Sequence, residues 1–103
     1  MIDSPQFPVI VIYPGASPED MEELVVDPLE EAIYALESIK KIKTEIKDGV
    51  AVMIVEYNYN EDVDEKYQEL VREINAVRPD LPENIFSIKI NLWPRDLKDN
   101  PVP

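Results

Sequence analysis

The residues in this sequence that could do chemistry are almost all carboxylates and lysines. The chain of 103 residues contains 22 Asp and Glu against 10 Lys and Arg, and it has no histidine and no cysteine. Histidine is the commonest general base and metal ligand, and a cysteine thiolate is a common nucleophile. The chemistry that remains is cation binding by carboxylates, or acid–base work by pairs of a carboxylate and a cation.

The spacing of these groups supports neither possibility. The pairs Glu22 with Lys40 and Glu69 with Arg72 have no evident nucleophile and base beside them. The acids of residues 19–37 spread over several faces of the helix expected there, and "NEDVDE" (residues 60–65) lacks the turn glycine and closing Glu of a calcium loop. We interpret these acids as solvated helix surface, with Asp62 as a helix N-cap, and predict no catalytic residue, no metal site and no cofactor.

Composition excludes further classes of function. The formal net charge of −12 repels phosphate backbones, so we do not expect a nucleic-acid partner. No apolar run reaches the roughly 18 residues of a membrane helix, and "MIDSPQ" does not resemble the start of a signal peptide. The length and the hydrophobic fraction of 45% predict one small globular domain.

The strands and helices that position these groups can be predicted from the spacing of apolar residues along the chain. Residues 7–14 and 50–59 are nearly continuous apolar runs, which indicates strands buried on both faces. Residues 39–49 alternate, with Ile42, Thr44 and Ile46 on one side and lysines on the other, and "KDGV" predicts a hairpin turn after them. Residues 85–93 alternate as well, which places Phe86 and every second residue after it on one face.

Two amphipathic helices separate these strands. The first is expected to begin after Ser17 as N-cap, and Pro28 should kink or split it. Its apolar stripe is predicted to contain Met21, Leu24, Val25, Leu29, Ile33 and Leu36. The second helix ends at Pro79 and Pro82, and its predicted apolar stripe contains Val63, Tyr67, Leu70, Ile74 and Val77.

The order β-α-β-β-α-β predicts an α+β, ferredoxin-like fold with a split βαβ arrangement. The two apolar strands belong in the centre of the sheet and the two alternating strands at its edges, which gives the antiparallel order 4-1-3-2. Right-handed crossovers place both helices on one face. The other face then exposes side chains of the central strands, which need a partner, a ligand or another domain.

The sequence motifs within this order of strands and helices resemble the first periplasmic porter subdomain of resistance–nodulation–division (RND) efflux transporters. The resemblance rests on Tyr13-Pro14-Gly15-Ala16 at the end of the first strand and on the segment Pro28–Ala32 in the first helix. It is extended by the glycine hairpin and by the Leu81-Pro82 pair that ends the second helix. The match covers residues 7–93. We expect the Tyr13–Ala16 turn itself to be structural, since Gly15 can take positive φ and Pro14 fixes φ.

The resemblance implies a larger, non-enzymatic protein. RND exporters of drugs and other amphiphiles are proton-driven homotrimers of the bacterial inner membrane, and they work with a periplasmic adaptor and an outer-membrane channel. Residues 7–93 would be a periplasmic porter subdomain, residues 1–6 would lead in from a preceding membrane helix, with Met1 an introduced start, and residues 94–103 would be a linker. The partners would then be the other porter subdomains and the transmembrane domain.

The resemblance also assigns two surfaces. The polar stripe on the second helix would line a central pore and contact the other protomers; it consists of Asp64, Gln68, Arg72 and Asn75. The alternative is a solvated helix face. The open sheet face would lie beside the substrate route, through Ile10, Val52, Asn91 and Trp93, and the alternative there is interdomain packing. Met53 is expected in the core rather than in a metal pocket.

Two other functions fit the same topology. A stand-alone ferredoxin-like domain could bind a small ligand or dimerise through its open sheet face. An acylphosphatase-like enzyme would need a phosphate-binding loop after the first strand, and the acids after "YPGAS" argue against it.

Overall fold

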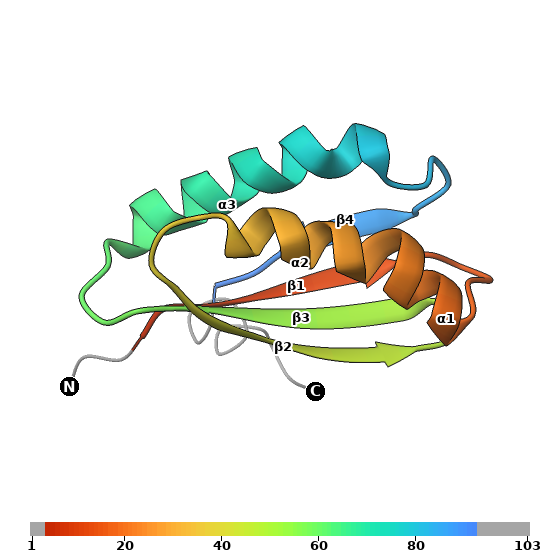
Figure 1. Cartoon of the computed structure of the whole chain (residues 1–103), viewed down its shortest axis with the longest axis horizontal. Helices are drawn as coiled ribbons and strands as arrows, with labels where there is room; N and C mark the ends of the chain where they lie inside the picture. The colour runs from red at the N-terminus through yellow and green to blue at the C-terminus, as the bar shows by residue number, and fades with distance from the viewer. Residues whose placement is uncertain (1–3, 93–103) are drawn as a thin grey trace, which may run out of the picture.

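Four antiparallel strands form one sheet in the computed structural model, which describes residues 4–92. The strands are β1 (Gln6–Ile12), β2 (Ile39–Lys47), β3 (Val50–Tyr57) and β4 (Ser87–Ile90). Their order is β2-β3-β1-β4 (Figure 1), which is the predicted 4-1-3-2 arrangement read from the other edge. The expected α+β fold and its split βαβ topology are therefore confirmed.

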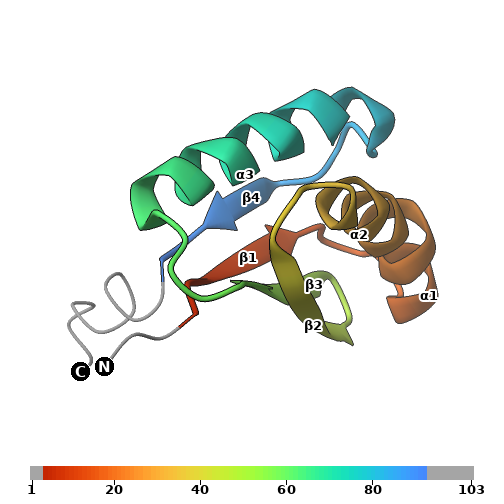
Figure 2. The same cartoon turned by 60° about the vertical axis from the view of Figure 1, so that its left-hand side comes forward.

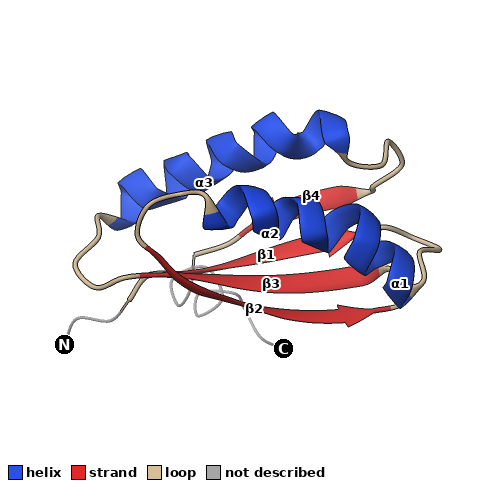
Figure 3. Ribbon diagram, in the orientation of Figure 1, coloured by secondary structure: helices blue, strands red, loops and turns tan. Residues whose placement is uncertain are grey.

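The helices form a single layer over one face of this sheet. They are α1 (Pro18–Met21), a π-helical turn η1 (Glu22–Val26), α2 (Asp27–Tyr34) and α3 (Val63–Val77), which the short 3₁₀ turn η2 (Arg78–Asp80) extends. Figures 2 and 3 show all of them on the same side, as right-handed crossovers require. The opposite face of the sheet carries no helix among the described residues.

The core lies between the two layers and is built by alternate residues of the central strands. Phe7, Val9 and Val11 of β1 are fully buried, and so are alternate residues of β3 from Ala51 to Tyr57. Ile10 and Val52, which lie between these residues, are half-buried because the face on which they lie has no helix over it. Met53 is in the core, as expected.

The first helical segment keeps its predicted start but changes its helical register before Pro28. The Ser17 hydroxyl accepts a hydrogen bond from the Asp20 amide at 3.1 Å, which is an N-cap. The Asp27 amide then donates to the carbonyl of Glu22, five residues back, so the chain forms a π turn before the proline rather than a sharp break. The extra residue per turn moves the apolar stripe: Val26 is buried, and Leu24, predicted in the stripe, is 42% exposed.

The fourth strand is shorter than predicted. It begins at Ser87, and Phe86, which alternation places on the same face as Ile88 and Ile90, is 77% exposed. The Phe86 amide still donates to the carbonyl of Ile12, so this residue follows the line of the strand. Alternation predicts burial of a side chain only where another layer packs on that face of the sheet. At Phe86 no described layer covers the ring.

Candidate functional site

Helix α3 carries the first predicted functional surface, and local signals fix both of its ends. The Asp62 carboxylate accepts a hydrogen bond from the Glu65 amide at 3.0 Å, so Asp62 is the N-cap that the sequence predicted. At the other end Pro79 lies in the 3₁₀ turn η2, and Leu81 is buried just after it. The helix is therefore stopped, and its last turn held, by the segment that resembles the RND family.

All four residues of the predicted pore stripe are exposed on α3: Asp64, Gln68, Arg72 and Asn75. The row that α3 buries against the sheet contains Leu70 and Ile74. Successive residues of an α-helix are about 100° apart, so all four stripe residues lie about 100–180° around the helix from the middle of that buried row and point away from the sheet. Within residues 4–92 none of the four side chains makes a hydrogen bond or an ion pair, which leaves the stripe available for contacts outside this domain.

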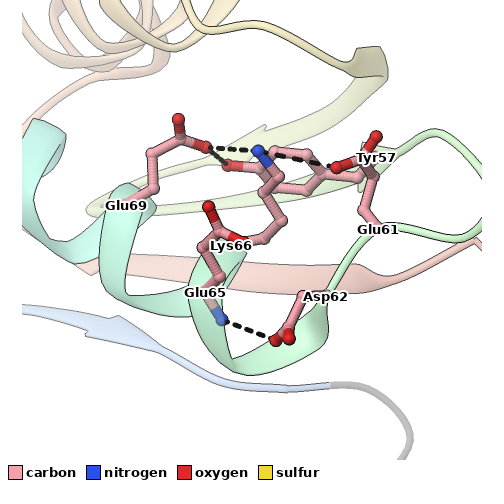
Figure 4. A network of polar contacts seen from close by, with 6 residues as sticks. All are labelled: Tyr57, Glu61, Asp62, Glu65, Lys66 and Glu69. Atoms are coloured by element: carbon pink, nitrogen blue, oxygen red, sulfur yellow. Dashed lines mark hydrogen bonds and ion pairs between the residues drawn. The ribbon is translucent and has the colours of Figure 1, made fainter.

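The inner side of α3 contains a polar cluster that the sequence patterns did not reveal. Lys66 is only 9% exposed, and its ammonium lies 3.6 Å from a carboxylate oxygen of Glu61 and 3.5 Å from one of Glu69 (Figure 4). The Tyr57 hydroxyl donates to the same Glu69 oxygen at 3.2 Å. The ammonium also lies 5.6 Å from the centre of the Tyr57 ring, which is fully buried and packs edge-on against Phe7.

The electrostatics of this cluster hold both protonated groups in their ordinary forms. Burial raises the pKa of the Tyr57 phenol far above its usual value, and the neighbouring Glu69 carboxylate raises it further. Burial alone would lower the pKa of the Lys66 ammonium, but the carboxylates of Glu69 and Glu61 outweigh this effect and raise it. Lys66 is therefore a cation and Tyr57 a hydrogen-bond donor near neutral pH, and neither of these two groups is poised for proton transfer.

The signal that could have revealed Lys66 is its spacing. Lys66 precedes the core residues Leu70 and Ile74 by four and eight positions, so it begins the buried row of α3. The predicted apolar stripe contained Val63 and Tyr67 instead, and both are only half-buried. A lysine in a buried row is retained when carboxylates pair with it, and the sequence does not show which carboxylates lie near it in the fold.

The open sheet face is the second predicted surface, and the structure brings part of its set together. Ile10 of β1 and Val52 of β3 are direct partners across the antiparallel pair. Asn91 is half-buried, and its amide donates to the carbonyl of Pro8, which continues the β4–β1 pairing beyond the end of β4. Trp93, the fourth predicted residue, lies outside the described residues.

The rim of this open face is rich in lysine although the protein is strongly acidic. Lys43 and Lys47 of β2 stand opposite Ile54 and Val50 of β3, and Lys89 of β4 stands opposite Ile10. A shallow hollow of about 260 Å³ lies on this face, lined by Lys43, Thr44, Glu45, Val52 and Ile54. An apolar centre with charged margins is the usual composition of a surface that meets a partner or an amphiphilic ligand.

The Tyr13–Ala16 turn is held by the β2–β3 hairpin. The Tyr13 amide donates to the Gly49 carbonyl at 2.8 Å, and the Gly49 amide donates to the Ala16 carbonyl at 2.9 Å. Gly15 and Gly49 both adopt positive φ, at 86° and 72°. The motif that carries much of the family resemblance therefore joins two loops, and its contacts support the structural role expected for it.

The two acid–base pairs considered from the sequence are not formed. Glu69 is paired with Lys66 and not with Arg72, and between residues 4 and 92 no ion pair joins Glu22 to Lys40. Lys40 instead lies 3.5 Å from Glu56. In the described part of the chain no three metal-ligating side chains gather as a cation site would require.

Comparison with known families gives a direct result. A protein-family model described as the AcrB/AcrD/AcrF family matches residues 1–99.

The chain belongs to the AcrB/AcrD/AcrF family.

Membership confirms the resemblance to RND transporters that the sequence motifs indicated. The matched region contains both the Tyr-Pro-Gly-Ala turn and the Leu81-Pro82 pair after the second helix. The AcrB/AcrD/AcrF family is a family of transporters rather than of catalytic enzymes, which argues against the acylphosphatase-like interpretation. It also favours a part of a larger transporter assembly over a stand-alone ligand-binding domain. Among the helices of residues 4–92, none combines the length and the apolar character that crossing a bilayer demands.

Proposed function

We propose that this chain is the first porter subdomain of a proton-driven RND exporter of drugs or other amphiphiles, in the periplasmic part of a bacterial inner-membrane transporter. Its role would be mechanical: it supplies a pore helix, contacts between protomers and one wall of the substrate route. The observation that carries the proposal is the family match over residues 1–99 of a chain with the split βαβ topology.

Helix α3 would be the pore helix of each protomer in a homotrimer. Its outward stripe carries one anion, one cation and two amides, all of them exposed: Asp64, Arg72, Gln68 and Asn75. Copies of such a stripe around a threefold axis bring exposed polar side chains of neighbouring protomers close to one another. A polar pore lining of this kind gives protomer contacts without an apolar site for substrate, so the helix would hold the trimer together rather than bind cargo.

The open sheet face would form one wall of the substrate route. Ile10 and Val52 give it a half-buried apolar centre, and the amide of Asn91 lies at its β4 end. Trp93, from the segment that follows, would add a large flat apolar surface with a single hydrogen-bond donor. Neighbouring porter subdomains would supply the rest of the pocket, and rigid βαββαβ units would open and close it as they shift against one another. The energy would come from proton movement in transmembrane segments, and the periplasmic adaptor and outer-membrane channel would complete the path.

Cross-linking in the full-length transporter tests the pore helix. The described chain contains no cysteine, so a thiol introduced into this subdomain by Gln68→Cys would be the only one in it, and the remainder of the transporter would be used with its own cysteines replaced. We expect a short thiol cross-linker to join protomers of Gln68→Cys into covalent dimers. The matched control Glu31→Cys, exposed on α2, should stay monomeric. Equal cross-linking of both variants, or of neither, would contradict the pore assignment.

A further inference from the structure

The row of side chains that α3 buries is unusual at its first position. Leu70 and Ile74 are buried apolar residues of this row, but Lys66, one turn before Leu70, is a charged one. The other apolar residues of the first two turns, Val63 and Tyr67, are only half-buried. Before Leu70, the middle residue of α3, the helix therefore has no fully buried apolar side chain to define its rotation about its own axis.

Lys66 supplies that definition through a buried charge held between two carboxylates. Its ammonium is held by Glu61, in the loop before the helix, and by Glu69 on the helix itself. Glu69 in turn accepts a hydrogen bond from Tyr57, at the end of β3 (Figure 4). Apolar contacts tolerate small rotations, whereas a rotation that separated the Lys66 ammonium from its carboxylates would leave a buried charge unpaired, at a high cost. The cluster therefore joins helix, loop and strand at one place.

The position of Lys66 also determines where the outward stripe points. Because residues are about 100° apart around an α-helix, Asp64 and Gln68, each two positions from Lys66, point about 160° away from it. We infer that Lys66 is a positioning residue: its ammonium, held between Glu61 and Glu69 over the Tyr57 ring, sets the rotation of the N-terminal half of α3 and so the direction of Asp64 and Gln68. The functional meaning of that direction rests on the proposed pore helix, but the rotation itself is a property of this chain.

The alternative rotation is specific. If the helix turned by one residue step, the half-buried Tyr67 would enter the position of Lys66, and Lys66 would reach water. A step of about 100° would displace a side-chain group that lies about 5 Å from the helix axis by about 8 Å. An uncompensated buried ammonium would favour that rotation, because the rotation would carry the unpaired charge into water and the Tyr67 ring into the buried position.

Spin-label distances measure this rotation in the chain itself, which contains no cysteine of its own. Nitroxides at Gln68→Cys and Glu45→Cys report on the N-terminal half of α3, and labels at Asn75→Cys and Glu45→Cys report on the half anchored by Ile74. In Lys66→Ala, which removes the charge and leaves no large apolar side chain in its place, we expect the first distance distribution to broaden or shift by several Å. The second distribution should stay unchanged. Lys66→Arg, which restores a cation between the two carboxylates, should recover the first distribution.

A second variant keeps the test decisive if Lys66→Ala does not fold. Glu61→Gln with Glu69→Gln leaves the lysine in place and removes its two partners, so the same shift in the Gln68 distance is expected. An unchanged Gln68 distance in both variants would overturn the inference, since the apolar core alone would then set the rotation. Equal broadening at Gln68 and Asn75 would overturn it as well, because Lys66 would then act on the whole domain. Neither result depends on a trimer or on transport, so each is distinct from failure of the proposed function.

Discussion

Ile10 of β1 stands directly opposite Val52 of β3 in the centre of the sheet, on the face that the helices leave uncovered. The next residue along each strand, Val11 and Met53, is fully buried under the helices. One peptide step thus separates the folding core from the proposed route for substrate. This close spacing lets single substitutions separate the two roles.

Alanine substitutions at neighbouring positions of β3 should have very different effects on stability. Met53→Ala removes a fully buried side chain and should lower the free energy of unfolding by about 2–5 kcal/mol. Val52→Ala removes a half-buried one from the open face, and we expect a cost of about 1 kcal/mol or less. Urea denaturation of the chain measures both values. Equal losses would show that the open face is packed as tightly as the core.

A carboxylate placed on the open face should impair export without unfolding the domain. In the full-length transporter, Val52→Glu would put a charge against the apolar part of a passing amphiphile, and we expect export to fall by about tenfold or more. Leu24→Glu, which makes the same kind of change on the exposed side of the helix layer, should leave export near its original level. Transport assays on cells with matched protein levels measure the difference, and a loss common to both variants would point to folding rather than to the route.

Stability should fall at alkaline pH because of Tyr57. Burial, helped by Glu69, raises the pKa of this phenol in the folded protein above the ordinary value of 10.0. Above that ordinary value the unfolded chain releases the proton and the folded chain keeps it, so the folded state loses stability as pH rises, by up to about 1.4 kcal/mol per pH unit for this one group. The stabilisation is fully present below pH 10. The raised pKa of Lys66 acts in the same direction.

Tyr57→Phe removes only the first of these contributions. The variant should lose about 1 kcal/mol at neutral pH with the hydrogen bond to Glu69, but its stability should decline less steeply than the original between about pH 10 and pH 11.5. Denaturation curves recorded across this range check the prediction. Parallel declines in the two proteins would mean that Tyr57 does not keep its proton in the folded state.

The two glycines of the joined loops should differ in their tolerance of alanine. Both have positive φ, so either substitution costs about 1 kcal/mol for backbone strain. At Gly49 an added Cβ would also lie 3.3 Å from the Tyr13 carbonyl oxygen, whereas at Gly15 it would meet no atom within 4 Å. Gly49→Ala should therefore be clearly the more destabilising of the two in thermal or urea denaturation. The reverse order would show that the loops are not held together as described.

The two aspartates at the start of α3 should separate a structural role from a surface role. Asp62→Ala removes the N-cap and should destabilise the chain by about 1 kcal/mol. Asp64→Ala, at the second position of the helix, removes a side chain that makes no hydrogen bond or ion pair within residues 4–92, and it should have a much smaller effect on stability. Circular dichroism during denaturation gives both values. A large loss for Asp64→Ala would assign this residue to the fold and weaken its proposed place in the pore stripe.

Sequence periodicity predicted the fold well because each strand and helix reports its own environment. The continuous apolar runs became β1 and β3 in the centre, the alternating runs became the edges β2 and β4, and Ser17 and Asp62 became helix caps. The errors occur where a second element decides. Leu24 left the stripe because a π turn precedes Pro28, and Phe86 is exposed because no described layer covers it. The pore and route assignments remain proposals, with Trp93 outside the described residues.

By itself the sequence determined the element order, the strand order and the family. These depend on local hydrophobic patterns and on short sequence motifs, which can be recognised without the structure. Only the tertiary structure decided which carboxylates meet Lys66, and that Ile10 faces Val52. Glu61, Glu69 and Tyr57 come from a loop, a helix and a strand, and charge pairing depends on distances in space that residue spacing does not contain. The physical reason is that hydrophobic patterns indicate which residues are buried, whereas tertiary packing determines which side chains come into contact.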